Sequence, residues 1–446
     1  MASPWPATFV PPRGAEPAHL GGVRLTDLAA EWGTPAFVLD LAHLTARVGQ
    51  WAEAARVHFA PERGLAGADV YYASKAFTCI AMVELARDHG LCLDTASGGE
   101  LAIGLAGGMP AERIALHGNN KSAGEIRSAL AHGVGRIVID SLDEVDLVGR
   151  IAAELDVVAP AFLRVTTGIH AGANELISTG HEDQKFGLSI ASGAALAAAR
   201  AVVDHPSLDL LGLHSHIGSQ VLDDAAHRLA AEALLRFRAE VARETGVLVP
   251  EVDLGGGFGI SYTGEDPLTP DEIMAALSES VRTTCVDLAT AVPRISVEPG
   301  RHIIGPAMIS LYTVGTIKPA TLPDGERWYV SVDGGMSDNI RPVLYDAAYR
   351  AALVSRESTA EHRRSRLVGK HCESGDILVK DLGLPADLRA GDLVAMAATG
   401  AYGRSMASNY NLLLRPPVLA VVDGGVTEWV RRETIADVLA LDPRAG

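Results

Sequence analysis

Short runs of apolar and β-branched residues recur along the first two-thirds of the chain, and each run ends in polar or glycine-rich positions. Within a run the apolar residues are nearly continuous and do not alternate with polar ones. This pattern is typical of parallel strands that are covered on both faces. Eight such runs occupy residues 70–76, 91–97, 113–120, 136–141, 161–167, 210–219, 251–259 and 294–301.

The segments between these runs carry the signals of helix starts. Ser122 precedes Glu125, and Ser141 precedes Glu144, at the three-residue spacing of a capping box, and residues 269–272 read Thr-Pro-Asp-Glu. Strand and helix therefore alternate eight times, which predicts an α/β fold with a (β/α)8 TIM-type barrel. An open doubly wound sheet is the alternative, and we favour the barrel because eight units close more naturally than they spread.

The pattern changes after residue 305. Short strand-like runs follow one another with turns and few long helices, which predicts an antiparallel β-sandwich or barrel domain. We therefore divide the chain into residues 1–45, which include an early strand-like run and join the C-terminal domain, the barrel at 46–306, and the β domain at 307–446. The charged segment 355–366 predicts a surface loop or linker.

Composition and charge exclude several classes of function. A hydrophobic fraction of 48% excludes a disordered chain. The 38 Lys and Arg residues against 55 Asp and Glu residues leave a net charge of −17, which argues against binding to nucleic acid or to an anionic membrane. No run approaches the roughly 20 apolar residues of a membrane span, and the N-terminus lacks the pattern of a signal peptide. Four cysteines without a CxxC pair predict neither a disulfide framework nor a zinc ribbon. We therefore expect a cytoplasmic protein with no metal site.

Polar residues stand at the ends of the predicted strands, where barrel enzymes carry their active groups. They are Lys75, Asp94, His117, Asn119, Asp140, Arg164, His214, His216, the glycines 255–257, Glu298 and Arg301. The glycines after the seventh strand and the 298–301 segment after the eighth occupy the usual phosphate site of such barrels, because backbone N–H groups converge on an anion where no Cβ intervenes.

Lys75 ends an apolar strand, where a lysine is costly unless it is paired or used. An amine in such a setting can form a Schiff base with a carbonyl, whereas a salt bridge with Asp94 is the structural alternative. An amine beside a phosphate site predicts a phosphorylated aldehyde as ligand. Pyridoxal phosphate is one such ligand, and a sugar phosphate acted on by an aldolase is the other.

Several motifs, in order and at matching intervals, resemble the barrel-type pyridoxal-phosphate decarboxylases of fold type III. They are residues 72–76, 93–100, 214–220, 253–257, 298–301, 371–376 and 400–402. The resemblance runs from about residue 33 to beyond residue 411. It implies that Lys75 holds pyridoxal 5'-phosphate through a Schiff base, that His216 stacks on the pyridine ring and that Glu298 pairs with the ring nitrogen. The other cofactor contacts that it implies are Asp94 near the ring, and Ser219, Gly257, Gly300, Arg301 and Tyr402 at the phosphate.

The resemblance also implies a substrate. Arg301, Arg341 and Tyr345 match the family positions that bind the far carboxylate of meso-2,6-diaminopimelate, and Glu373 matches the acid that binds its distal ammonium. Tyr402 belongs to the same substrate-binding set. The implied reaction is decarboxylation to L-lysine and CO2, the last step of lysine biosynthesis.

The family works as a homodimer whose active site is shared, so the resemblance implies that the β domain completes the site of the neighbouring subunit. Cys372 and Glu373 would then act in trans. Cys372 is the candidate proton donor, with Lys75 as the alternative. Residues 168–184 are expected to form a mobile cover over the site.

Three other functions remain open on the sequence. A decarboxylase of the same fold acting on ornithine, arginine, carboxynorspermidine or a D-amino acid is disfavoured by Arg341 and Glu373. A non-catalytic relative that binds a partner enzyme is disfavoured because Lys75 and the phosphate loops are retained. A sugar-phosphate aldolase would leave the β domain unexplained.

Overall fold

The computed structural model describes residues 2–169 and 185–445, so most of the expected cover segment 168–184 lies outside the described residues. The chain forms two compact units. The barrel unit comprises residues 47–259 and 267–300, and the sheet unit comprises residues 1–46, 260–266 and 301–446. Residues 260–266 and 301–306 thus group with the sheet unit.

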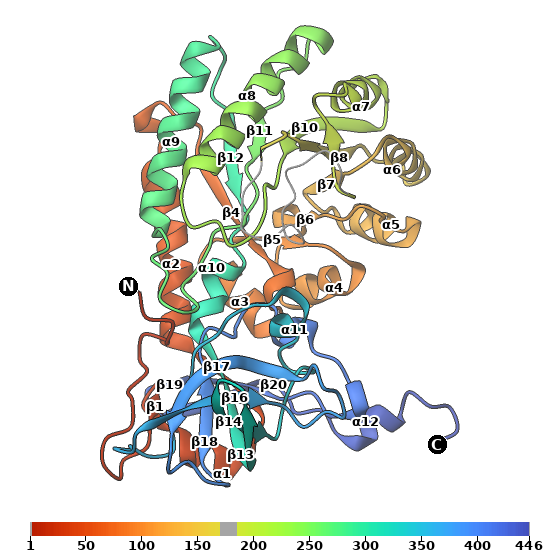
Figure 1. Ribbon diagram of the computed structural model, residues 1–446. Coiled ribbons are helices and arrows are strands. Elements are labelled where there is room, and N and C mark those ends of the chain that lie inside the picture. The colour runs from red at the N-terminus through yellow and green to blue at the C-terminus, as the bar shows by residue number, and fades with distance from the viewer. Residues whose placement is uncertain (1, 170–184, 446) are drawn as a thin grey trace. The chain divides into compact units, whose positions relative to one another are not determined.

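The barrel unit is a closed ring of eight parallel strands, each of which overlaps one of the eight apolar runs (Figure 1). The strands are β4 (Ala68–Ala73), β5 (Cys92–Thr95), β6 (Ile114–Leu116), β7 (Arg136–Ile139), β8 (Ala159–Thr166), β10 (Leu208–His214), β11 (Glu251–Asp253) and β12 (Arg294–Val297). The ring closes because β12 pairs with β4 and β10 pairs with β8, while the short β9 (Leu188–Ser189) pairs in parallel with the last residues of β8. The predicted TIM-type barrel is confirmed.

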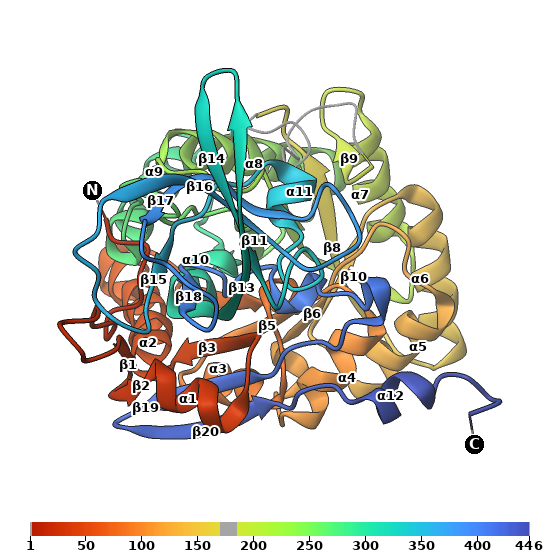
Figure 2. The ribbon, with the colours of Figure 1, turned by 60° about the horizontal axis from the view of Figure 1, so that its bottom comes forward.

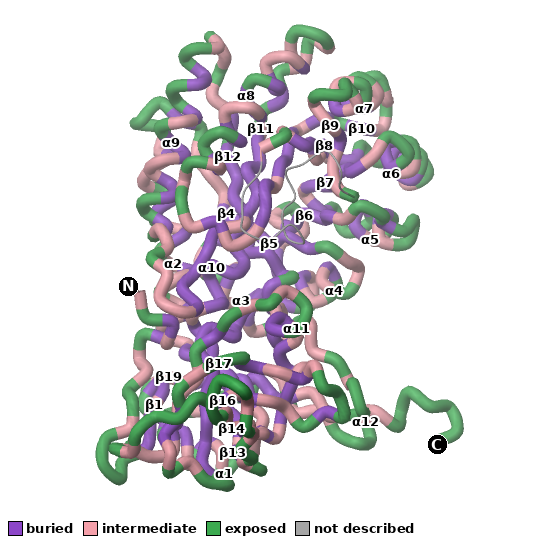
Figure 3. Tube along the Cα trace, viewed as in Figure 1, coloured by how far each residue is buried: buried purple, intermediate pink, exposed green. Residues whose placement is uncertain are grey.

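Helices surround these strands and turn their apolar sides inward, so that the strands are buried and the outer helix faces are exposed (Figure 3). They are α2 (Leu41–His58), α3 (Ile80–Asp88), α4 (Gly98–Ala106), α5 (Ala123–His132), α6 (Leu142–Glu154), α7 (Ala194–Asp204), α8 (Ala225–Thr245) and α9 (Pro270–Asp287). The predicted capping boxes at Ser122 and Thr269 are both present. At α6, Ser141 caps the helix, but the Glu144 carboxylate accepts from the N–H of Asp140 instead of completing a box.

The sheet unit is built on the long strand β13 (Met308–Leu322), which forms an antiparallel hairpin with β14 (Gly325–Val332) (Figure 2). The strand order is β17-β16-β14-β13-β3-β19-β20, and β18 and β15 pair beside it. These strands are β3 (Ala36–Asp40), β15 (Ala351–Leu353), β16 (His362–Val368), β17 (Ile377–Pro385), β18 (Leu393–Met396), β19 (Val418–Val422) and β20 (Gly425–Val430). The early run at 33–40 therefore joins this sheet through β3.

Two expectations for the sheet unit were wrong in part. The sheet is mixed and not purely antiparallel, because β3 pairs in parallel with β19 and β14 pairs in parallel with β16. Parallel neighbours need long connections, and the whole barrel separates β3 from β19 in the sequence. The charged segment 355–366 is also not all loop, since its last residues begin β16, where the first three side chains are exposed.

Short elements complete the sheet unit. They are β1 (His19–Leu20), β2 (Val23–Arg24), α1 (Leu25–Trp32), α10 (Arg301–Ile304), α11 (Arg341–Tyr345) and α12 (Ile435–Leu439). Across the described parts of the chain, none of the helices combines the length and the apolar character that crossing a membrane would need.

Candidate active site

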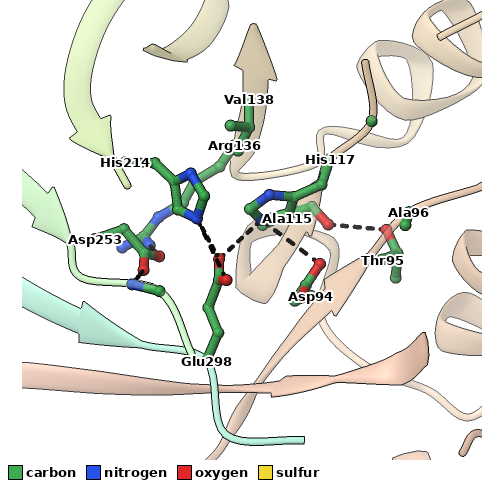
Figure 4. Close-up of polar contacts among 12 residues, drawn as sticks. Asp94, Thr95, Ala96, Ala115, His117, Arg136, Val138, His214, Asp253 and Glu298 are labelled. Atoms are coloured by element: carbon green, nitrogen blue, oxygen red, sulfur yellow. Dashed lines mark hydrogen bonds and ion pairs between the residues drawn. The ribbon is translucent and has the colours of Figure 1, made fainter. Parts of the chain in front are cut away.

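Four of the predicted strand-end residues meet inside the barrel around the carboxylate of Glu298 (Figure 4). Glu298 follows β12, and its carboxylate lies 3.1 Å from Nε2 of His117 and 3.3 Å from Nε2 of His214. His117 also lies 3.6 Å from Oδ1 of Asp94, the third residue of β5. Parallel strands bring these ends together because all eight end at one face of the barrel.

The charges of this cluster are set by burial and by neighbouring groups. Burial raises the pKa of Glu298, but His214 and His117 together lower it by more, so that the pKa lies well below its usual range. Burial lowers the pKa of His117, but Asp94 and Glu298 raise it above the usual value. Burial lowers the pKa of His214. At neutral pH Glu298 is therefore ionised and His214 is neutral, while His117 holds a proton more tightly than a free histidine does.

One oxygen of Glu298, Oε1, has no hydrogen bond, although Nε2 of His117 and Nε2 of His214 both approach it. Oε1 and Nε2 of His117 are both buried, and their contact lacks the geometry of a hydrogen bond. A buried carboxylate oxygen without a hydrogen bond is costly, and a protonated pyridine nitrogen would satisfy it. The ligand atoms of Glu298, His117 and His214 also lie within 4.8 Å of one another, a spacing at which they could hold a metal ion.

Glycines after β11 and β12 keep the backbone bare beside this cluster. Gly257 has a φ of 100°, and a Cβ there would lie 2.3 Å from the carbonyl oxygen of Gly218. A Cβ on Gly300 would lie 2.9 Å from the Cβ of Ala73, at the end of β4. No other residue type fits these positions without shifting the backbone, and bare N–H groups form an anion site. This loop fits the phosphate of pyridoxal phosphate.

Lys75 lies directly after β4, within the short 3₁₀ turn Ser74–Ala76. The lysine is exposed, whereas both of its neighbours are buried. The positive charge of Lys75 favours the ionised form of Asp94 and the neutral form of His216, since it acts to lower the pKa of both. Burial, followed by the charges of Lys75 and Arg164, lowers the pKa of His216 well below its usual value, so the His216 ring is neutral.

The sheet unit holds a second cluster, made of two arginines and three tyrosines. Arg301 and Arg341 are both buried. Arg301 donates to the hydroxyl of Tyr262 and lies 4.8 Å over the ring of Tyr402. Arg341 donates to the hydroxyl of Tyr349 and lies 4.8 Å over the ring of Tyr262. The sequence analysis identified the arginines and Tyr402 but missed Tyr262 and Tyr349.

Electrostatics make Arg341 a strong candidate for anion binding. Burial lowers its pKa, but the neighbouring tyrosines more than reverse this, and it stays cationic. Within residues 2–169 and 185–445, no carboxylate forms an ion pair with Arg341. Burial raises the pKa of Tyr349 to about 12, so its hydroxyl stays neutral. A buried guanidinium whose neighbours are neutral hydroxyls and rings favours an anionic ligand.

The remaining predicted residues lie on the sheet unit or in the loop near Gly257. Tyr345 ends α11, four residues after Arg341, which places the two on one side of that short helix. Cys372 and Glu373 are exposed in the loop between β16 and β17. The main-chain N–H of Cys372 donates to Asn411, and Glu373 accepts from the N–H of Gly375. Ser219 lies between β10 and α8, and Gly218 beside it faces Gly257.

Comparisons with known proteins agree on one family. Residues 43–305 match the family model described as pyridoxal-dependent decarboxylase, pyridoxal binding domain. The diaminopimelate decarboxylase of Mycobacterium tuberculosis strain H37Rv is 48% identical over 434 residues, covering 95% of this chain and 94% of the relative. That of Bacillus subtilis strain 168 is 43% identical over 425 residues, with coverages of 95% and 94%. The crystal structure of diaminopimelate decarboxylase from M. jannaschii in complex with L-lysine is 30% identical, covers 98% of each chain and superimposes with a TM-score of 0.88.

Proposed function

The chain belongs to the pyridoxal-dependent decarboxylase family, and we propose that it decarboxylates meso-diaminopimelate to L-lysine and CO2. Relatives that bear this activity in their names match nearly the whole chain at 43–48% identity. One of the similar structures was solved with L-lysine, which is the product of the proposed reaction. The enzyme is thus a carboxy-lyase that serves lysine biosynthesis.

Pyridoxal phosphate, when bound, supplies an electron sink for the pair of electrons that the departing CO2 leaves behind. The residues of the barrel unit fit this cofactor. Lys75 would hold the aldehyde carbon, and Oε1 of Glu298, which has no hydrogen bond within the protein, would accept the N–H of the ring nitrogen. The loop around Gly257, with Ser219, Gly300 and Arg301, would bind the phosphate.

The substrate's far end is assigned to the sheet unit. The observation that carries this assignment is Arg341, a buried cation beside neutral tyrosines. Diaminopimelate differs from lysine by a second carboxylate, and a planar guanidinium binds a carboxylate through two parallel hydrogen bonds. Arg301, Tyr345 and Tyr402 complete the set, and Glu373 would bind the distal ammonium. An ornithine or arginine decarboxylase would have no use for a buried arginine at this position.

Protonation at Cα completes the reaction, and two residues can supply the proton. Cys372 carries a thiol on an exposed loop, and Lys75 carries an amine at the barrel strand ends. Asp94, whose Oδ1 lies 3.6 Å from Nε2 of His117, would lie near the pyridine ring of the cofactor. His216 is neutral, and the face of a neutral imidazole can stack on the ring without adding a charge.

We extend the proposal to a homodimer in which Cys372 and Glu373 serve the partner's site. Both residues are exposed in one chain. Beside them, Tyr410 and Leu412 are 41% and 67% exposed, which leaves apolar surface next to the loop. Such surface is typical of an interface.

The four cysteines are all free, which suits the reducing cytoplasm as the location of the enzyme.

The test is CO2 release by purified protein loaded with pyridoxal phosphate. We expect turnover of meso-diaminopimelate and none of L-ornithine, L-arginine or carboxynorspermidine. Turnover of another substrate in place of meso-diaminopimelate would leave the cofactor chemistry intact and overturn the role given to Arg341. No CO2 from any of the four, despite bound cofactor, would overturn the proposed function.

A further inference from the structure

His227 is a buried histidine with no role in the chemistry above, and it hydrogen-bonds to the glycine loop, residues 255–257. It lies in the first turn of α8 and is 4% exposed. Its ring stacks on Phe258, with the ring centroids 4.6 Å apart and the planes 15° apart. Phe258 also packs on Trp51 of α2, at 5.0 Å between centroids. Packing alone does not explain a histidine here, because phenylalanine would fill the same space without a polar edge.

The polar edge of His227 holds the main chain of Gly256. Nε2 lies 3.1 Å from the carbonyl oxygen of Gly256, and since a carbonyl only accepts, Nε2 carries the proton and donates it. The N–H of the same glycine donates to Nδ1 of His216 at 3.1 Å. His216 must therefore carry its own proton on Nε2. Both polar groups of Gly256 are thus fixed by histidine rings.

Hydrogen bonds are the means by which this loop is held. A Cβ on Gly256 would lie 2.2 Å from the carbonyl oxygen of Glu298, so no side chain can brace the position. Glycine without a brace samples many backbone conformations. The neighbouring glycines are held in the same way, by the N–H of Glu298 on the carbonyl of Gly255 and the N–H of Val221 on that of Gly257. His227 is the side chain that bonds the carbonyl of the middle glycine, whose N–H bonds His216.

His227 keeps one donor at neutral pH. Burial lowers its pKa, while the carbonyls of Gly256 and Asp223 raise it by less, so the ring is neutral. A neutral imidazole has a single N–H, and the hydrogen bond from Nε2 to the carbonyl of Gly256 assigns it to Nε2.

We infer that His227 is a positioning residue for the cofactor, which fixes the main chain of Gly256 and thereby sets the N–H of Gly257 for the phosphate and the ring of His216 for the pyridine. The inference rests on the proposed function, because it takes pyridoxal phosphate as the ligand of this loop. We assign His227 no contact with the cofactor or the substrate, because its hydrogen bond is to Gly256 and its ring packs on Phe258.

The experiment compares two substitutions that separate packing from hydrogen bonding. His227→Phe keeps the ring against Phe258 and removes the donor, whereas the amide Nε2 of His227→Gln can reach the same carbonyl. The dissociation constant of pyridoxal phosphate is measured by absorbance titration of apoprotein, together with that of pyridoxal, which has no phosphate. We expect His227→Phe to raise the constant for pyridoxal phosphate about tenfold, the worth of one hydrogen bond. His227→Gln stays within about threefold of wild type, and the pyridoxal constant changes less than that of pyridoxal phosphate.

His132→Phe is the matched control, because His132 is an exposed histidine on α5, and it leaves both constants unchanged. Thermal unfolding shows whether each variant folds, and His227→Met replaces His227→Phe as the apolar arm if the latter does not. An unchanged constant in the apolar variant overturns the inference, as does a His227→Gln variant that binds as weakly as the apolar one. If the wild-type protein binds pyridoxal phosphate normally but releases no CO2 from meso-diaminopimelate, that result would contradict the proposed function alone.

Discussion

His117 Nε2 lies 3.1 Å from Glu298 Oε1, and neither atom is exposed to solvent. The imidazole also approaches Asp94, so the ring lies between two buried carboxylates, and these raise its pKa. Glu298 can therefore stay ionised at neutral pH although it is buried. If Glu298 pairs with the ring nitrogen of the cofactor as proposed, an ionised carboxylate is the form that a protonated pyridine needs.

The first prediction concerns this contact and pH. The pKa of His117 is raised in the folded protein, so its protonated form stabilises the fold below the unfolded value of about 6.5. That contribution is lost as the pH rises through the folded pKa. We therefore expect His117→Gln to lower the free energy of unfolding of the apoprotein by more at about pH 6 than at about pH 9. Urea unfolding of both proteins at the two pH values measures this difference.

His132→Gln is the control for the loss of a histidine at an exposed position, where the structure gives no buried carboxylate neighbour. An equal loss of stability at both pH values would show that His117 contributes packing and not charge. A loss that grows with pH would contradict the direction assigned to its pKa.

The barrel and its polar strand ends could be predicted from the sequence, because each strand is a buried apolar run and each run ends in polar or glycine-rich residues. What the sequence could not give is which ends meet. Glu298 follows β12, whereas His117 follows β6 and His214 ends β10, and the three side chains meet only because all of them enter the interior of one curved ring of strands. The same holds for Tyr349, whose contact with Arg341 depends on a turn between α11 and β15.

Other elements escaped because their local signal was weak. The beginning of β16 carries His362 and two arginines with exposed side chains, so its charge suggested a loop. Its pairing with β14 and β17, not its composition, makes it a strand. His227 escaped for a similar reason, since nothing in the sequence of α8 shows that its ring reaches Gly256.

The second prediction tests the bond between Lys75 and the cofactor. Borohydride reduction of the holoprotein, followed by peptide mass spectrometry, should place the pyridoxyl group on the peptide that contains Lys75. Lys75→Ala should lose activity by about three orders of magnitude or more, because the amine that exchanges with substrate is gone. Lys370→Ala, at a lysine between β16 and β17, serves as the control and keeps full activity. A pyridoxyl group on another lysine would overturn the assignment.

The third prediction concerns the far carboxylate of the substrate. Arg341→Lys keeps the charge but loses the planar pair of donors, so the KM for meso-diaminopimelate should rise about tenfold to hundredfold. Tyr349→Phe removes the hydroxyl that accepts from Arg341 and should raise KM by about threefold. Arg350→Lys is the matched control, because Arg350 is exposed and donates to the backbone of Thr263. Unchanged KM values in the first two variants would show that the carboxylate binds elsewhere.

The last prediction separates a shared site from a site within one chain. Lys75→Ala and Glu373→Ala should each be nearly inactive, because one lacks the cofactor lysine and the other the acid that binds the distal ammonium. If Glu373 serves the partner's site, a heterodimer of the two variants holds one site with both residues intact. Half of the dimers are mixed after random reassembly, so about a quarter of wild-type activity should return when equal amounts are mixed, dissociated and reassociated. If both residues serve the same chain's site, each chain of the mixture carries one defect and no activity returns. Light scattering on the separate variants and on the mixture shows whether dimers form, so that a missing recovery can be attributed to the site and not to failed assembly.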